Sequence, residues 1–175
     1  MFRGTRLHTT DFKTDSDKRV LFLANELATA KFAEVFAVAC NASKAYKNGL
    51  IVHLNGDLGA GKSFFSRAFV QHFLPDQKVK SPTYTIVETY NCYNFAVHHL
   101  DLYRLCDPEE LEYLAVRDLL SSSFVALVEW PQKGKGVLPE ADIEMTISLK
   151  AQGRQVKCLA KSPKGHLVLA KLEGL

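Results

Sequence analysis

Residues 56–63 constrain this chain more than any other feature of its sequence. They read Gly-Asp-Leu-Gly-Ala-Gly-Lys-Ser, which is a glycine, four residues, then Gly-Lys followed by Ser or Thr. An apolar run at 50–55 precedes them, and a predicted helix at 62–74 follows and ends before Pro75. Strand, glycine loop and helix in this order form the context of a phosphate-binding loop. An ordinary strand-to-helix turn is the alternative, and the agreement of all three parts argues against it.

Each part of this loop has a chemical task. The glycines allow backbone N–H groups to turn inward around a phosphate, and the positive end of the helix dipole faces the same anion. Lys62 is placed to reach the β- and γ-phosphates of a nucleotide, and the Ser63 hydroxyl is placed to hold Mg²⁺.

Phosphoryl transfer also needs a carboxylate on the metal side, usually at the end of a buried strand. Glu129 follows the apolar run 124–128, and Asp101 follows the run 96–100. The first run is fully apolar, as in a central strand, so we predict Glu129 as the direct Mg²⁺ partner. Asp101 is predicted to orient the attacking water or a metal-bound water. For either acid, a hydrogen bond from a strand end to a loop is the structural alternative.

Two further segments carry polar side chains. The segment 81–85, Ser-Pro-Thr-Tyr-Thr, offers three hydroxyl groups and a tyrosine beside a rigid proline. It is either a loop that senses the γ-phosphate or a plain loop that leads into a strand, and the residues alone leave both open. His98 and His99 are adjacent and point to opposite faces of a strand, so we predict no shared metal site.

The rest of the pattern predicts alternating strands and helices. Strands are predicted at 19–23, 50–55, 86–93, 96–101 and 124–128, with antiparallel tail strands around 143–149, 156–159 and 167–169. Helices are predicted at 26–40 after an Asn25 cap, at 62–74, and from Asp107-Pro108 to about 120, with a loop at 41–49 and a tight turn at Tyr93-Asn94. We expect residues 1–17 to be a poorly ordered lead-in and residues 18–175 to form one domain.

Composition excludes several classes of protein. Hydrophobic residues make up 47% and charged residues 23% of the 175 residues, as in ordinary globular domains. The net charge of +3 is too weak to argue for nucleic-acid binding by itself. The four cysteines form no closely spaced pair, which argues against a zinc ribbon. The polar start and the short apolar runs predict neither a signal peptide nor a membrane span, so we expect a cytoplasmic protein.

Four blocks follow the phosphate loop in a fixed order. They are Lys-Ser-Pro-Thr-Tyr-Thr at 80–85, His-Leu-Asp-Leu-Tyr-Arg at 99–104, Asp-Pro-Glu-Glu-Leu at 107–111 and Val-Glu-Trp-Pro at 128–131. With the loop, they resemble the TsaE family, P-loop ATPases of bacterial tRNA threonylcarbamoyladenosine synthesis. The resemblance runs from about residue 25 to about residue 149 and is highly specific, because several separate blocks match in order.

This resemblance implies a fold, an activity and partners. The fold would be an α/β P-loop domain with a mixed sheet flanked by helices and antiparallel C-terminal strands. The activity would be Mg²⁺-dependent ATP hydrolysis, weak in the isolated protein, with ATP and ADP as nucleotides. The partners would be the TsaB–TsaD pair, which installs threonylcarbamoyl on the adenosine beside the tRNA anticodon. Contact with tRNA would be indirect, and neither DNA nor a membrane is expected.

The resemblance also assigns roles to residues. The nucleotide-binding residues would be Thr29, Gly59, Ala60, Gly61, Lys62, Ser63, Phe64, Thr83 and Trp130. Ser63 and Glu129 would coordinate Mg²⁺, and Asp101, Glu129 and Lys62 would be the catalytic residues. Thr29 would lie near the base and ribose, and Thr83 near the γ-phosphate.

The chain departs from the family pattern near the nucleotide. Phe64 stands where a small hydroxyl residue is common, which removes a side-chain hydrogen bond to the α-phosphate. After Pro131 the chain reads Gln-Lys-Gly, where many members carry an acid or an arginine. Contacts from that loop are therefore left unassigned.

Two other functions fit a small P-loop protein. A small-molecule kinase would need an acceptor site and an arginine-rich lid, whereas the arginines here are few and dispersed. A regulatory module would bind nucleotide without turnover. A GTPase is disfavoured because no Asn-Lys-x-Asp segment for reading guanine is present.

Overall fold

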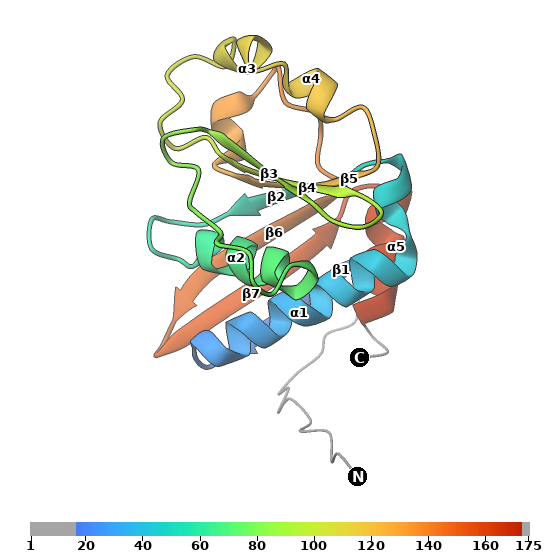
Figure 1. Ribbon diagram of the computed structural model, residues 1–175. Coiled ribbons are helices and arrows are strands. Elements are labelled where there is room, and N and C mark those ends of the chain that lie inside the picture. Colours follow the sequence, from blue (N-terminus) through green and yellow to red (C-terminus); the bar gives the residue numbers. More distant parts are fainter. Residues whose placement is uncertain (1–16, 173–175) are drawn as a thin grey trace.

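One mixed sheet organises the molecule, for which a computed structural model describes residues 17–172 (Figure 1). The strands are β1 (Lys18–Leu23), β2 (Leu50–Asn55), β3 (Val87–Asn91), β4 (Ala96–Asp101), β5 (Phe124–Glu129), β6 (Ile143–Lys150) and β7 (Gly153–Ala160). Their order across the sheet is β1-β7-β6-β2-β5-β4-β3. Strands β4, β5, β2 and β6 are parallel, while β3, β7 and β1 pair antiparallel with their neighbours. The predicted α/β class with a mixed sheet is confirmed.

Helices cover both faces of this sheet. They are α1 (Glu26–Ser43), η1 (Ala45–Asn48), α2 (Lys62–Phe73), α3 (Glu110–Tyr113), α4 (Val116–Leu119), η2 (Pro131–Gly134) and α5 (Pro163–Lys171). α1, α2 and α5 pack on one face, and α3 and α4 lie over the other (Figure 1). Among the described residues, no helix combines the length and apolar character that crossing a membrane requires.

Aromatic rings fix α2 against α1. Phe32 and Phe36 lie one helical turn apart on α1, and Phe65 and Phe69 do the same on α2. Phe65 lies 5.7 Å from Phe32 and 5.8 Å from Phe36 between ring centroids, so the two pairs interlock. Because α2 begins at the end of the glycine loop, this packing also fixes where that loop can lie.

Several local predictions are confirmed by backbone contacts. The Asn25 side chain accepts a hydrogen bond from the Ala28 N–H at 2.9 Å and caps α1. The Cys92 N–H donates to the Phe95 carbonyl at 2.9 Å, which closes the tight turn between β3 and β4. β5 lies between β2 and β4, as predicted for the fully apolar run before Glu129.

Other predicted elements are wrong. The helix expected from 107 to 120 is two short helices, because Ala115 adopts a left-handed φ of 48° between them. The predicted loop 41–49 contains the last turn of α1 and the short helix η1. The strand expected around 167–169 lies in α5, which Ser162 caps by accepting from the Gly165 N–H at 3.2 Å.

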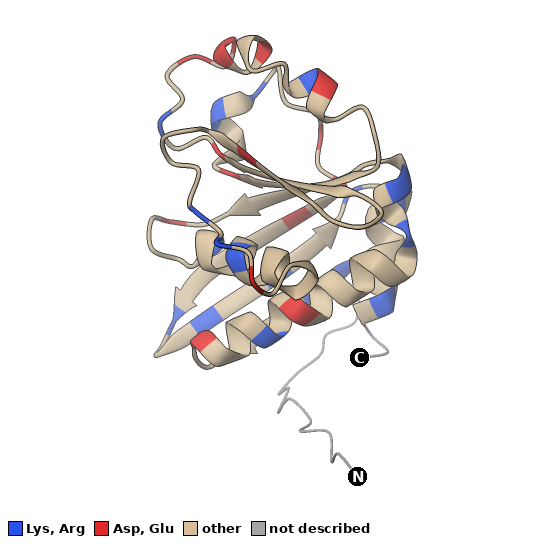
Figure 2. Ribbon diagram, in the orientation of Figure 1, with Lys and Arg blue, Asp and Glu red and all other residues tan. Residues whose placement is uncertain are grey.

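The ends of the other predicted elements lie within a few residues of the observed ones. Most of the predicted lead-in cannot be compared with the structure. Residues 1–16 of the predicted lead-in 1–17 lie outside the described residues. The basic residues are distributed over most elements in the view of Figure 2, in agreement with the scattered charges of the sequence.

Gly165→Ala is expected to lower the free energy of unfolding by about 1–3 kcal/mol. A Cβ at this position would overlap the Asp142 carbonyl oxygen and lie 3.2 Å from Cγ1 of Ile143. In an uncrowded helix the same change would stabilise by up to about 1 kcal/mol. Urea denaturation measures the difference, and the exposed Leu167→Ala on the same helix serves as control. A midpoint equal to or above that of wild type would contradict the close approach of α5 to the sheet.

Candidate phosphate-binding site

The glycine loop connects the end of β2 to the start of α2. Gly56 and Gly61 have φ angles of 146° and 107°, which side chains with a Cβ rarely adopt. A Cβ at Gly56 would overlap the Ile147 carbonyl oxygen, and one at Gly61 would lie 2.9 Å from Nε of Arg154. Within the described residues, no side chain caps the amino end of α2. The helix N-terminus is therefore free of a side-chain cap, as a site for an anion requires.

Lys62 is the buried cation of the site. Its residue surface is 4% exposed, and its Nζ donates to the Gly56 carbonyl at 2.6 Å and to the Asp57 carbonyl at 2.9 Å. The same Nζ lies 4.2 Å from the centroid of the Trp130 ring. Burial lowers the pKa of Lys62, and the charges of Glu129, Asp101 and Asp57 raise it back in part.

The two predicted acids come together at one edge of the sheet. Asp101 ends β4, Glu129 ends β5, and the two are register partners on these parallel strands. Val125 and Leu127 of β5 belong to the core under α1 and α2, so Glu129 faces α2 by strand alternation. The Ser63 hydroxyl of α2 donates to Oε2 of Glu129 at 3.0 Å. The predicted pair of Mg²⁺ ligands is therefore in contact.

The segment 81–85 reaches the same place. The Thr83 hydroxyl donates to Oδ2 of Asp101 at 3.2 Å. The Ser81 hydroxyl oxygen lies 2.8 Å from the Thr83 hydroxyl oxygen. The other oxygen of Asp101 accepts from the Tyr103 N–H at 3.1 Å. Asp101 thus links the segment to the strand end, and sensing of the γ-phosphate by Thr83 stays a prediction.

A hollow of about 380 Å³ collects these groups. Its walls are formed by Leu58, Gly59, Gly61, Lys62, Ser63, Phe64, Ser81, Thr83, Asp101, Tyr103, Glu129, Trp130 and Arg154. Trp130 enters this wall because its φ of 57° turns the chain sharply after β5. Its ring lies 5.1 Å from that of Tyr103, so two aromatic rings flank the lysine side of the hollow.

Two predicted nucleotide-binding residues are not part of these walls. Ala60 lies in the loop, but it is 1% exposed. Thr29 lies in the first turn of α1, where its hydroxyl donates to the Asn25 carbonyl at 3.1 Å and the residue is 1% exposed. The predicted contact of Thr29 with base and ribose stays a prediction.

The structure adds two residues that sequence reasoning missed. Nε of Arg154, at the start of β7, donates to the Ala60 carbonyl at 2.9 Å and braces the loop. Nothing local in the sequence signals this contact, because 94 positions separate the partners. Nε2 of His99 lies 2.7 Å from Oε1 of Glu129. The strand period could have found His99, since it shares a face with Asp101 two residues later.

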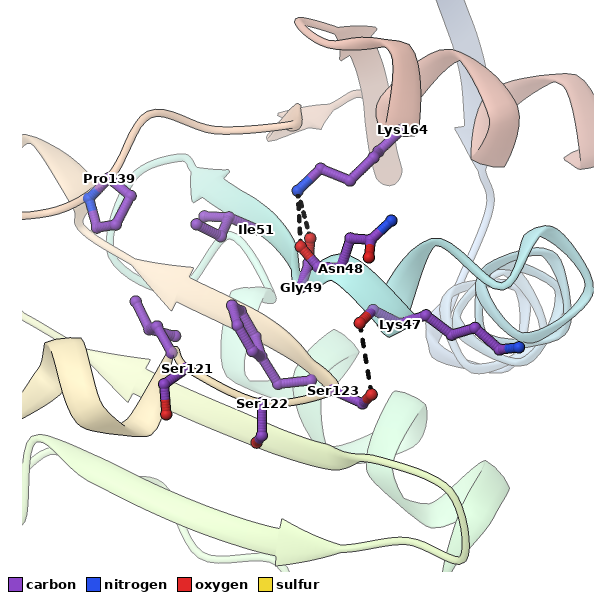
Figure 3. Close-up of a pocket in the computed structure, with 11 residues that line it drawn as sticks. Lys47, Asn48, Gly49, Ile51, Ser121, Ser122, Ser123, Pro139 and Lys164 are labelled. Atoms are coloured by element: carbon purple, nitrogen blue, oxygen red, sulfur yellow. Dashed lines mark hydrogen bonds between the residues drawn. The ribbon is translucent and has the colours of Figure 1, made fainter.

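A larger hollow of about 780 Å³ lies at the amino-terminal ends of β2 and β5, away from Asn55 and Glu129 (Figure 3). One of its two lining lysines, Lys164, is already engaged by the carbonyls of Asn48 and Gly49 and by the Asp142 carboxylate at 3.1 Å. Ser123 donates weakly to the Lys47 carbonyl at 3.5 Å. Size alone therefore does not mark the functional site, which we assign to the smaller hollow with its buried lysine and paired acids.

Comparison with known proteins identifies the chain's relatives. The family model "Threonylcarbamoyl adenosine biosynthesis protein TsaE" matches residues 23–156. The tRNA threonylcarbamoyladenosine biosynthesis protein TsaE of Haemophilus influenzae is 39% identical over 152 residues, which are 85% of this chain and 94% of that protein. The Bacillus subtilis protein of the same name is 34% identical over 114 residues, which are 65% and 71% of the two chains.

A solved structure shares the fold. The crystal structure of Bacillus subtilis YdiB superposes with a TM-score of 0.71 at 23% identity, covering 90% of this chain and 95% of that one. At this identity the likeness concerns the arrangement of the elements.

Proposed function

This chain belongs to the TsaE family of threonylcarbamoyl adenosine biosynthesis proteins, and from that premise we propose that it binds and hydrolyses ATP for this tRNA modification. One observation carries the proposal: Lys62 and Ser63 of the glycine loop lie in a single hollow with Glu129 and Asp101. We further propose that it works in the cytoplasm with the TsaB–TsaD pair and contacts tRNA only through that pair.

The residues present fit a Mg²⁺ ion. The Ser63 hydroxyl and the Glu129 carboxylate offer oxygen ligands 3.0 Å apart, and Mg²⁺ prefers such hard donors with few protein ligands. We propose that Ser63 and Glu129 hold the ion. When bound, Mg²⁺ supplies positive charge that neutralises phosphate oxygens.

The chain's own groups would divide the remaining tasks. The loop N–H groups and the start of α2 bind phosphate, and Lys62 adds a positive charge that water screens poorly because it is buried. Asp101 accepts a hydrogen bond from the attacking water or from a metal-bound water. Thr83, which donates a hydrogen bond to Asp101, would exchange that bond for one to the γ-phosphate. Trp130, whose ring lies 4.2 Å from the Lys62 ammonium, would shield that group from water.

Trp130 provides a direct test, because it is the single tryptophan in the sequence and lies over Lys62. ATP and ADP with Mg²⁺ are expected to change its fluorescence saturably, while GTP competes weakly. No response to any nucleotide would contradict the proposal. Robust phosphate transfer to a small acceptor without a partner would favour a kinase instead. Among the described residues that line the hollow, Arg154 is the only arginine, which is poor support for a kinase lid.

Asp101→Asn is expected to lower ATP hydrolysis by about a hundredfold or more, because proton acceptance and water orientation are worth this much. ATP affinity, read from Trp130 fluorescence, should change by only a few fold, since the Thr83 hydroxyl can still bond the amide oxygen. Asp76→Asn, on an exposed loop, is the matched control.

The Mg²⁺ dependence of the Asp101→Asn variant separates its two candidate roles. Partial recovery at high Mg²⁺ would identify a holder of metal-bound water, whereas no recovery would identify a base. Hydrolysis equal to wild type would contradict both roles.

A further inference from the structure

A buried histidine lies directly behind Glu129. His99 of β4 is 1% exposed and Glu129 of β5 is 2% exposed, and Nε2 lies 2.7 Å from Oε1. An ionised Glu129, which Mg²⁺ binding requires, can only accept, and in that state Nε2 of His99 carries the proton that forms this bond. Burying an imidazole costs free energy unless its polar atoms are bonded, so an apolar residue would suit a packing role better.

The two oxygens of Glu129 have different partners. Oε2 accepts from the Ser63 hydroxyl on the side of the hollow, and Oε1 accepts from His99 on the side of the interior. The carboxylate plane is therefore fixed between α2 and β4. Nδ1 of His99 is buried and has no hydrogen-bond partner within the described part of the chain. Glu129 is thus the polar contact that the structure gives this ring.

We propose that His99 is a positioning residue that holds the Glu129 carboxylate with Oε2 turned toward the metal site beside Ser63. This rests on the proposed function, because it presupposes that Glu129 holds Mg²⁺. Residues that orient a metal ligand by hydrogen bonding typically change metal affinity by about ten- to a hundredfold when they are replaced. His99 acts through Glu129, not on the nucleotide.

The neighbouring histidine supplies a matched control. His98 is 3% exposed and lies on the opposite face of β4, where Nδ1 is 3.0 Å from the Thr89 hydroxyl. It has the same ring, the same strand and similar burial, but in the described part of the chain it makes no hydrogen bond to Glu129. Loss of a buried imidazole in general and loss of this particular hydrogen bond can therefore be distinguished.

The test follows binding of a non-hydrolysable ATP analogue by Trp130 fluorescence, with EDTA and across a Mg²⁺ titration. In His99→Leu we expect affinity in EDTA within about twofold of wild type and a Mg²⁺ requirement raised about ten- to a hundredfold. His99→Gln, which keeps a donor near Nε2, should stay within about threefold of wild type. His98→Leu should leave the Mg²⁺ requirement unchanged.

The outcomes separate this inference from the function on which it rests. An unchanged Mg²⁺ requirement in folded His99→Leu, or an equal loss in His98→Leu, would overturn the positioning role alone. A wild-type chain whose nucleotide binding ignores Mg²⁺ would overturn the proposed function with it.

A measurement on the wild-type chain does not depend on a stable variant. Nitrogen-15 NMR of the histidine rings, with His99→Gln for assignment, should show His99 protonated on Nε2 with a slowly exchanging proton. Protonation on Nδ1 alone, or rapid exchange of the Nε2 proton, would contradict the hydrogen bond to Glu129.

Discussion

Lys62→Met is expected to lower partner-stimulated ATP hydrolysis by about a hundredfold or more, which is the usual cost of removing one group that stabilises developing charge. Lys62 is 4% exposed, so its ammonium group acts where water screens little. Methionine keeps most of the aliphatic length and its packing on Trp130, but it lacks the ammonium group that we propose contacts phosphate. ATP affinity should also fall, because we propose that the lysine binds the triphosphate before any bond breaks.

The control for this change is Lys78→Met, which removes the same charge from an exposed position after α2. Urea denaturation of both variants checks that each is folded, because Lys62→Met also removes the bonds of Lys62 to the Gly56 and Asp57 carbonyls. If Lys62→Met hydrolysed ATP within a few fold of the wild-type rate, this result would contradict a catalytic role for Lys62.

Glu129→Gln is the second change with a large expected effect. Glutamine has the shape of glutamate and can still bond the Ser63 hydroxyl and His99, so the local structure should persist. It loses the negative charge that a divalent ion requires, and hydrolysis should fall by about a hundredfold or more. ATP binding in EDTA should be equal or tighter, because a like charge near the phosphates has been removed.

This opposite pair of effects distinguishes a lost metal ligand from general damage to the site. Glu112→Gln, on the exposed surface of α3, is the control and should match wild type in both measurements. Weaker ATP binding in EDTA together with lost hydrolysis would show that Glu129 supports the fold of the hollow instead of holding Mg²⁺.

Local sequence rules found the elements whose determinants are local. The Asn25 cap, the two-residue turn after Cys92 and the buried strand before Glu129 each depend on a few neighbouring residues. The prediction of a third tail strand was wrong for a related reason. Apolar alternation around 167–169 predicts a strand, although Ser162 followed by a proline at the first helical position signals a helix start.

The part of the site that lies at strand ends and in the glycine loop was predictable from the sequence. The sequence itself shows two acids that follow apolar runs and a lysine that follows glycines. Parallel strand pairing brings these residues together. Arg154 was not predictable, because β7 reaches the loop only through the order of the whole sheet. The lining of the hollow by Trp130 depends on a left-handed backbone at a non-glycine residue, which no local rule anticipates.

Steady-state ATP hydrolysis with Mg²⁺, measured for the chain alone and with the TsaB–TsaD pair, tests the central claim most directly. We expect slow hydrolysis by the chain alone, a clear rise with the pair, and loss of that rise in Lys62→Met and Glu129→Gln. Saturable nucleotide binding with no hydrolysis even in the presence of the pair would contradict it and favour a nucleotide-dependent switch.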